Sequence, residues 1–146
     1  MNILKIIIVI SLKGRLFMSV PIKYSHQREA ILNNLKSRYD HPTAEMVYQD
    51  IKQELPNISL ATVYRNLNQL ADAGIIVRLY CNGKTDHFDA TTTPHYHFFC
   101  KCCGAVKDME MQPLPALIES AKKHSAFFID EASVLFSGIC DACSQG

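Results

Sequence analysis

The fold is decided at Ser59-Leu-Ala-Thr-Val-Tyr-Arg-Asn-Leu-Asn-Gln-Leu70. The apolar residues of this stretch recur at helical spacing, which predicts that one stripe of a helix is buried: Leu60, Val63, Leu67 and Leu70. The remaining positions then face largely outward: Ala61, Thr62, Tyr64, Arg65, Asn66 and Asn68. A helix that carries short polar groups and one arginine near its N-terminus fits the major groove of DNA.

Two amphipathic helices are expected before this stretch. The first begins at Ser25, an N-cap candidate, and runs to Leu35 with an apolar stripe made of Ala30, Ile31 and Leu35. In the second, Thr43 is the N-cap candidate, and the apolar residues at helical spacing are Met46, Val47, Ile51 and Leu55. Pro56 bounds this helix, because the residue before a proline avoids the helical conformation.

A β-hairpin is expected after Gly74. Residues 75–80 have strand composition, Asn82-Gly83 is a strong hairpin turn, and Thr85 to Asp89 form the returning strand. Three helices followed by a hairpin predict a winged-helix DNA-binding domain over residues 21–90. The pattern alone leaves DNA binding open, because helix-turn-helix signals are permissive and a small domain can carry a polar helix face without binding DNA.

The second half of the chain predicts a separate, smaller unit. Thr91-Thr-Thr-Pro94 is a polar, proline-ended hinge. Beyond it, residues 95–100, 105–108 and 133–138 have strand patterns, and residues 114–124 have a helical one. We therefore expect an α+β protein in which the winged helix is followed by a small α/β dimerisation and zinc-binding domain over residues 95–146. Because such a unit has a limited core, zinc and dimerisation are expected to support it.

Two Cys-x-x-Cys pairs indicate a structural zinc site: Cys100 with Cys103, and Cys140 with Cys143. Each pair lets two sulfurs bind one metal, and two pairs complete a tetrahedron that ties the C-terminus to the sheet. Cys102 offers Cys100 a second possible partner, but Cys103 is followed by Gly104 and makes the better turn. Cys81 and Cys102 are then expected to be free thiols rather than catalysts.

A second group of metal-ligand residues surrounds the first cysteine pair in the sequence. His95 and His97 are two positions apart on an expected strand, so both point to one face of it. Asp89 and Asp108 reach the same point if the strands pair, whereas His41 has to arrive from the other domain. Each of these residues taken singly is more often a solvated surface group, so the pattern leaves the five-residue set open.

Composition and charge limit the partners only weakly. The net charge is +1, and the first half is the less acidic one but not strongly basic, so a DNA-binding face has to place its few cations locally. The apolar segment 3–12 is shorter than the roughly 20 residues that span a bilayer, and Lys13 and Arg15 follow it in place of a cleavage pattern. We therefore expect residues 1–20 to be a leader produced by a misassigned start, with the true start at Met18, and the protein to be cytoplasmic without membrane contact. In that reducing compartment paired cysteines bind metal more often than they form disulfides.

Seven motifs between Ser25 and Cys143 are highly specific in combination: Gln27-Arg-Glu-Ala-Ile-Leu32, His41-Pro-Thr-Ala-Glu45, Ser59-Leu-Ala-Thr-Val-Tyr-Arg-Asn-Leu67, His87-Phe-Asp89, His95-Tyr-His97, Cys100-x-x-Cys103-Gly and Cys140-x-x-Cys143. Together they resemble the ferric uptake regulator family, and most closely its peroxide-responsive branch. The resemblance implies a dimeric, metal-dependent transcriptional repressor and not an enzyme, with an N-terminal winged helix and a C-terminal dimerisation domain.

The resemblance also implies ligands and partners. It assigns one set of residues to a regulatory Fe(II) or Mn(II) site, namely His41, Asp89, His95, His97 and Asp108, and it assigns the four paired cysteines to structural Zn(II). Three imidazoles and two carboxylates suit the regulatory metals and leave one coordination position open. Because His41 belongs to the DNA-binding domain, metal is expected to fix the two domains in one orientation. The implied partner is double-stranded operator DNA, bound by a homodimer through the helix from Ser59, with Tyr64 and Arg65 as the main contacts and Ala61, Thr62 and Asn66 beside them.

Few residues distinguish the branches of this family. Asp108 matches the peroxide-sensing branch, where iron-uptake regulators usually carry Glu, and Pro94 and Tyr96 stand where relatives with an additional metal site carry ligands. The implied signal is hydrogen peroxide, which reacts at Fe(II) so that His41 or His95 is oxidised and metal and DNA are released. The alternative within the family is an iron- or zinc-uptake repressor. A zinc enzyme or thiol oxidoreductase is the remote alternative, because four thiolates close a zinc site and no His-x-Glu or His-Glu-x-x-His motif is present.

Overall fold

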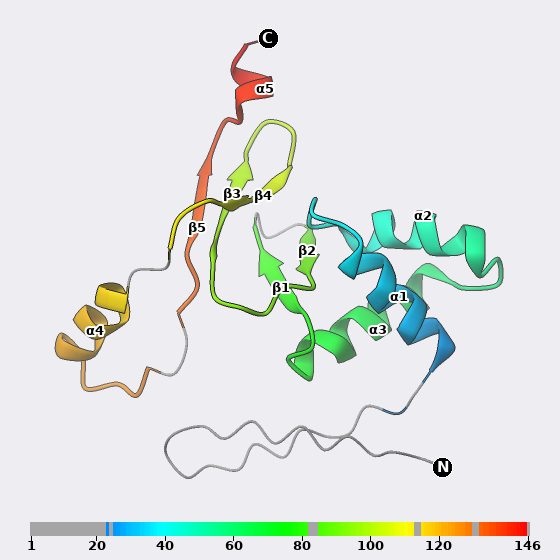
Figure 1. Cartoon of the computed structure of the whole chain (residues 1–146), viewed down its shortest axis with the longest axis horizontal. Helices are drawn as coiled ribbons and strands as arrows, with labels where there is room; N and C mark the ends of the chain where they lie inside the picture. The colour runs from blue at the N-terminus through cyan, green and yellow to red at the C-terminus, as the bar shows by residue number, and fades with distance from the viewer. Residues whose placement is uncertain (1–22, 24, 82–84, 113–114, 130–131, 146) are drawn as a thin grey trace.

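The N-terminal half of the protein forms three helices and a hairpin (Figure 1). The computed structural model describes residues 23, 25–81, 85–112, 115–129 and 132–145. The helices are α1 (His26–Lys36), α2 (Ala44–Glu54) and α3 (Leu60–Asp72), and the hairpin strands are β1 (Val77–Tyr80) and β2 (Asp86–Asp89), which pair antiparallel. This is the expected order of a winged helix. The expected leader over residues 1–20 and the Asn82-Gly83 turn lie outside the described residues.

The core of this half forms where the apolar stripes of the three helices meet strand β2. Its twelve buried residues are Ala30, Ile31, Leu35, Ala44, Val47, Ile51, Ile58, Val63, Leu67, Leu70, Ile76 and Phe88. Most of the expected stripe positions are buried, but Leu60 and Leu55 are half-buried and Met46 is exposed. The apolar stripes therefore pack as their periodicity predicts, and their side chains are more exposed near the helix ends.

Side chains cap two of these helices. The Thr43 hydroxyl accepts a hydrogen bond from the Met46 amide at the start of α2. The Ser59 hydroxyl accepts one from the Thr62 amide, 3.1 Å away, at the start of α3. Ser25 occupies the N-cap position of α1, but its side chain makes no capping hydrogen bond there, so the expected cap is absent.

The C-terminal half is a small mixed sheet. Strand β3 (Tyr96–Cys100) lies at its centre, pairs antiparallel with β4 (Val106–Met109) and pairs parallel with β5 (Leu135–Gly138). Helix α4 (Pro115–Lys123) connects β4 to β5, and a short helix not anticipated from the sequence, α5 (Asp141–Ser144), follows β5. Within the described residues, the buried hydrophobic side chains of this half are few: Tyr96, Phe99, Cys100, Val106 and Cys140. The two halves together make the protein α+β.

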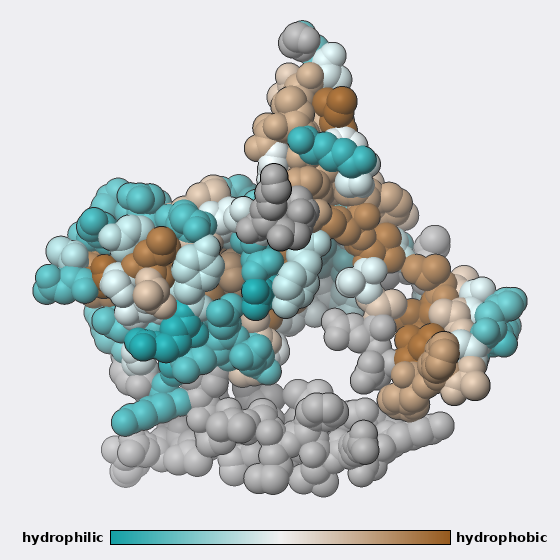
Figure 2. All heavy atoms as spheres, turned by 180° about the vertical axis from the view of Figure 1, so that it is seen from behind, coloured by the Kyte–Doolittle hydropathy of each residue, from teal (hydrophilic) through white to brown (hydrophobic). Residues whose placement is uncertain are grey.

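The surface of the C-terminal half is the more apolar one. Figure 2 shows hydrophobic residues gathered over this half, whereas the helical half is mostly hydrophilic. Phe127 and Phe128 are 79% and 78% exposed, and Ile139 is 62% exposed. No helix among the described residues is both long and apolar enough to cross a membrane. Exposed apolar patches often mark interfaces between protein chains.

Candidate metal centres

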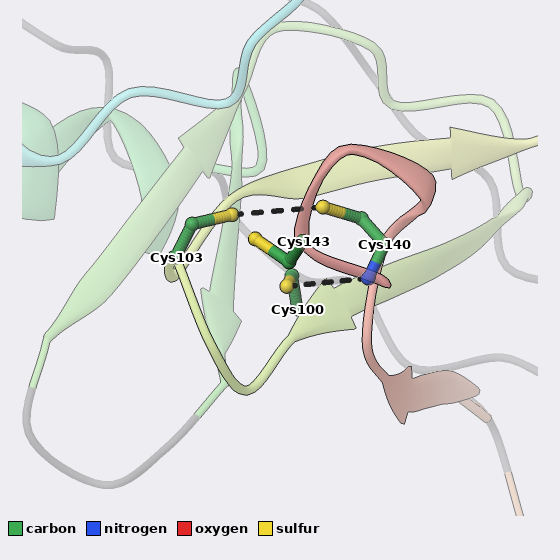
Figure 3. Close-up of side chains that lie close together, drawn as sticks. All are labelled: Cys100, Cys103, Cys140 and Cys143. Carbon is green, nitrogen blue, oxygen red and sulfur yellow. Dashed lines mark hydrogen bonds between the residues drawn. The ribbon is translucent and has the colours of Figure 1, made fainter. Parts of the chain in front are cut away.

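The two cysteine pairs converge on one point, and we call this group the thiol cluster: Cys100, Cys103, Cys140 and Cys143. Cys100 ends β3 and Cys103 lies in the turn before β4, whereas Cys140 precedes α5 and Cys143 lies within it (Figure 3). The four sulfurs lie within 4.8 Å of one another, and those of Cys103 and Cys140 are 3.8 Å apart. Ligands about 2.3 Å from a tetrahedral zinc stand about 3.8 Å apart, so the spacing fits zinc.

Backbone geometry sets up the first cysteine pair. Gly104 adopts a φ of 75°, a left-handed conformation that favours glycine, and its amide donates to the Cys100 carbonyl. Cys102 is exposed and stands outside the cluster, so the turn brings Cys103, and not Cys102, together with Cys100.

The electrostatics of the thiol cluster favour a bound cation. Backbone amides of Cys103 and Cys140 lower the pKa of Cys100 to about 6, the Cys140 amide donating to its sulfur over 3.4 Å. Contact with the Cys140 sulfur raises the pKa of Cys143. Four sulfurs at this spacing cannot all carry negative charge without a positive partner, and a divalent ion supplies one.

A second group, the histidine–aspartate cluster, lies where the two halves of the chain meet: His41, Asp89, His95, His97 and Asp108. His41 comes from the segment between α1 and α2, and Asp89 ends β2. His95 directly precedes β3, His97 lies within it, and Asp108 lies opposite His97 on β4. All five residues predicted from the sequence are therefore brought together, with ligand atoms within 4.8 Å of one another.

The distances inside this cluster fit a single metal ion. The Nε2 atoms of His95 and His41 lie 3.0 and 2.9 Å from Asp108 Oδ1. Each of the three Nε2 atoms lies between 3.1 and 3.6 Å from Asp89 Oδ2. Donors about 2.1 Å from one metal stand about 3 Å apart at adjacent octahedral positions, so five donors at these separations can share one ion and leave a sixth position open.

Neighbouring groups orient the ligands. The Nδ1 atom of His95 donates to the Thr93 carbonyl over 2.7 Å, which leaves the lone pair on Nε2. His95 Nε2 is itself buried without a well-formed hydrogen bond, which fits a nitrogen that binds a metal. The Thr91 amide donates to Asp89 Oδ1 over 2.7 Å and so leaves Oδ2 for the histidines.

The pKa values of two ligands reflect this crowding. Burial alone would raise the pKa of Asp89, but contacts with His41 and His97 and the Thr91 amide outweigh burial and lower it. Burial alone would lower the pKa of His41, but Asp89 and Asp108 outweigh burial and raise it. The Asp89 carboxylate thus remains ionised at neutral pH and can bind a cation.

The surface of α3 presents most of the residues expected to contact DNA. Ala61, Tyr64 and Arg65 are exposed. Among the arginines that the structure describes, Arg65 alone makes no hydrogen bond or ion pair, whereas the guanidinium groups of Arg38 and Arg78 contact carboxylates. Ser59 and Thr62 bond to each other through their hydroxyls, 2.9 Å apart. A free guanidinium is therefore available on this helix.

The outward orientation expected for Asn66 is wrong. Its side chain is buried, donates to the Thr62 carbonyl over 2.9 Å and accepts a hydrogen bond from Arg28 Nε over 3.1 Å. Asn66 therefore joins α3 to α1 and does not face solvent. The apolar spacing of α3 did not show this, because a polar partner on another helix satisfies the amide.

Comparison with known proteins gives the family. Residues 19–137 match the model of the ferric uptake regulator family. The chain belongs to this family. Over 124 residues it is 35% identical to the peroxide-responsive repressor of Staphylococcus aureus (strain Mu50), and the aligned region covers 85% of this chain and 84% of that protein. The relatives are thus regulators of transcription and not enzymes.

Two solved structures of ferric uptake regulator family members resemble this fold. The peroxide stress regulator of Campylobacter jejuni is 32% identical with a TM-score of 0.69, covering 80% of this chain and 88% of that one. The ferric uptake regulator of Helicobacter pylori, whose structure reveals three functional metal-binding sites, is 26% identical with a TM-score of 0.71, covering 86% of this chain and 84% of that one. Both branches of the family therefore share this architecture.

One residue of the site was missed in the sequence analysis. His87 is buried, and its Nδ1 atom lies 2.6 Å from the carbonyl oxygen of His41. The sequence signals for it were the His87-Phe-Asp89 motif and its position two residues before Asp89 on the same strand, which places both side chains on one face.

Proposed function

We propose that this protein is a metal-dependent repressor in which the histidine–aspartate cluster binds the regulatory metal and couples it to DNA binding. The observation that carries the proposal is the origin of the ligands. His41 belongs to the helical half, whereas His95, His97 and Asp108 belong to the three-stranded sheet and its entry. A metal held by all of them favours one arrangement of the two halves, and a ligand that favours one of two states shifts the population toward it.

Each segment of the chain has its own proposed role. Residues 21–90 act as the DNA-binding domain, residues 91–94 as the hinge, and residues 95–146 as the dimerisation and zinc-binding domain. Zn(II) in the thiol cluster is structural, since four thiolates close its coordination sphere. Fe(II) or Mn(II) is the regulatory metal, since mixed imidazole and carboxylate ligands with an open position suit an exchangeable ion.

Operator DNA is the proposed partner of α3. Exposed Arg65 has no competing carboxylate, and the phenol of Tyr64 donates a hydrogen bond of 2.6 Å to Glu45 on α2, which fixes the position of its ring. Ala61 and Thr62 flank these two residues on the same helix. A homodimer formed through the apolar face of the C-terminal half places two such helices on one duplex, and the exposed phenylalanines Phe127 and Phe128 support that interface.

Hydrogen peroxide is the proposed signal. Fe(II) held by these five ligands would supply the one-electron reduction of peroxide beside the rings of His41 and His95, and would regain that electron from the oxidised ring. One ring carbon gains an oxygen atom while peroxide is reduced to water, so the overall change is a balanced two-electron oxidation of histidine. The oxidised ring no longer binds metal in the same geometry, and both metal and DNA are released. Asp108 and the 35% identity to a peroxide-responsive repressor support this branch.

The experiment that tests this function compares two metals. The zinc-containing protein is loaded with Fe(II) or Mn(II) without oxygen and treated with equimolar peroxide, and DNA binding is followed together with peptide mass spectrometry of His41 and His95. The duplex is one that the Mn(II)-loaded protein enriches from a random library. Loss of binding with iron only, accompanied by one added oxygen on either histidine, supports peroxide sensing. Retained binding without histidine oxidation instead indicates a repressor that responds to metal level.

A further inference from the structure

His41 has an unusual backbone conformation for a residue that contributes a ligand. Its φ is 48°, in the left-handed region that side chains with a Cβ rarely adopt. Among the described residues it is the one non-glycine position with a positive φ. Pro42 follows it, and a residue before a proline is kept out of the right-handed helical region. Such a conformation persists only where the surroundings hold it in place.

Strand β2 holds this segment at consecutive positions. The His87 Nδ1 atom lies 2.6 Å from the His41 carbonyl oxygen, and the Phe88 amide donates to the Pro42 carbonyl over 3.0 Å. Thr43 forms an isolated β-bridge with His87. Because a carbonyl oxygen only accepts, the His87 Nδ1 atom must carry the proton and donate it.

His87, which contacts the His41 carbonyl, lies on the same strand as the ligand Asp89. His87 and Asp89 are two positions apart on β2, so their side chains lie on the same face. Both residues are buried, at 7% and 8% exposure. His41 Nε2 then reaches the other donors, with Asp108 Oδ1 only 2.9 Å away. The conformation of His41 and the position of Asp89 are thus set by the same short strand.

We propose that His87 is a positioning residue of the regulatory site, whose imidazole holds the His41 backbone in the left-handed conformation that directs its ring at the other ligands. This inference rests on the metal site proposed above. His87 binds no metal itself in this arrangement. It acts on metal affinity through His41, as outer hydrogen-bond partners of metal ligands generally do.

The test compares two amide side chains at position 87 in the full-length, zinc-containing protein. The amide nitrogen of Asn matches the position of Nδ1, whereas that of Gln matches Nε2, so His87→Asn can donate to the His41 carbonyl and His87→Gln cannot. We expect His87→Gln to weaken Mn(II) binding by about 10- to 100-fold, the range seen when an outer partner of a ligand is lost. His87→Asn is expected to recover most of the affinity. Calorimetry, or electron paramagnetic resonance of free Mn(II), gives both values.

A second readout needs no regulatory metal. The Phe88 amide, which bonds to the Pro42 carbonyl, is expected to exchange its hydrogen faster in metal-free His87→Gln than in wild type or His87→Asn. The matched control is His124→Gln, because His124 Nδ1 also contacts a backbone carbonyl, that of Ser120 over 2.8 Å, but on α4 away from the cluster. This control is expected to leave both readouts unchanged.

The outcomes separate the two claims. Equal Mn(II) affinity and equal Phe88 exchange in wild type, His87→Gln and His87→Asn overturn the role of His87 while the site stands. A wild-type protein that binds no Mn(II) refutes the regulatory site itself. Weakened binding in both variants with normal Phe88 exchange also overturns the inference, because the loss then does not arise from the His41 segment.

Discussion

Replacing Cys143 by Ser is expected to unfold the C-terminal half and leave the N-terminal half folded. Helix α5 buries none of its side chains, so the thiol cluster is its main attachment. Among the described residues of this half, the buried hydrophobic side chains other than cysteine are Tyr96, Phe99 and Val106. Burial contributes about 1.5–3 kcal/mol for each, whereas structural zinc contributes about 10–16 kcal/mol in small zinc domains. Zinc therefore outweighs the apolar core, and a hydroxyl is a poor substitute for a thiolate ligand.

The N-terminal half does not depend on zinc in the same way. Its core contains twelve buried residues, mostly from the three helices, and none of them belongs to the thiol cluster. Hydrogen exchange measured by mass spectrometry is expected to show loss of protection across β3, β4 and β5, with α1 to α3 still protected. Sedimentation is expected to show a monomer. Cys81→Ser, which lies outside the cluster, is the control and keeps zinc and dimer.

Two results would refute this reasoning. One is a Cys143→Ser protein that has lost zinc by elemental analysis and yet keeps the β3 amides protected, because the apolar core then suffices. The other is simultaneous loss of protection in α1 to α3, because the two halves then unfold as one cooperative unit.

Four further predictions concern the metal switch and α3. His41→Ala should weaken Mn(II)-dependent DNA binding while zinc content and dimer remain, and unchanged Mn(II) activation in fluorescence anisotropy would remove His41 from the site. Arg65→Ala should weaken DNA binding and reduce the slope of log affinity against log salt by about 1 if Arg65 contacts one phosphate; an unchanged slope and affinity contradict that contact. Asn66→Ala should lower the free energy of unfolding by about 1–3 kcal/mol in urea titrations, because Arg28 loses a buried acceptor, and a neutral result would show that water replaces it. The pKa of His41 is raised above 6.5, so its ion pair with Asp89 stabilises the zinc-loaded but otherwise metal-free protein most below pH 6.5, and this contribution is lost as pH rises through the raised value. In urea titrations between pH 5.5 and 8, the free energy of unfolding of wild type should therefore fall more steeply with rising pH than that of His41→Ala, and equal pH dependence contradicts the ion pair.

Much of the fold was predictable because helix and strand periods are local properties of the sequence. The apolar stripe of α1, the Thr43 cap and the strands around His97 follow from residues a few positions apart. The convergence of the four thiols was predictable for a similar reason, since two Cys-x-x-Cys turns each deliver two sulfurs to one point. The burial of Asn66 was not predictable, because its acceptor oxygen is satisfied by Arg28, 38 positions away in the chain.

The sequence by itself determined the chemistry of this protein: four thiols suited to zinc, three imidazoles and two carboxylates suited to an exchangeable metal, and a helix with one arginine near its N-terminus. Only the tertiary structure decided which of these groups meet. His41 joins ligands from the other half because β2 holds its backbone in a left-handed conformation, through a contact between residues 46 positions apart. Side-chain chemistry is fixed residue by residue, whereas the position of a ligand depends on the packing of segments that are distant in the chain.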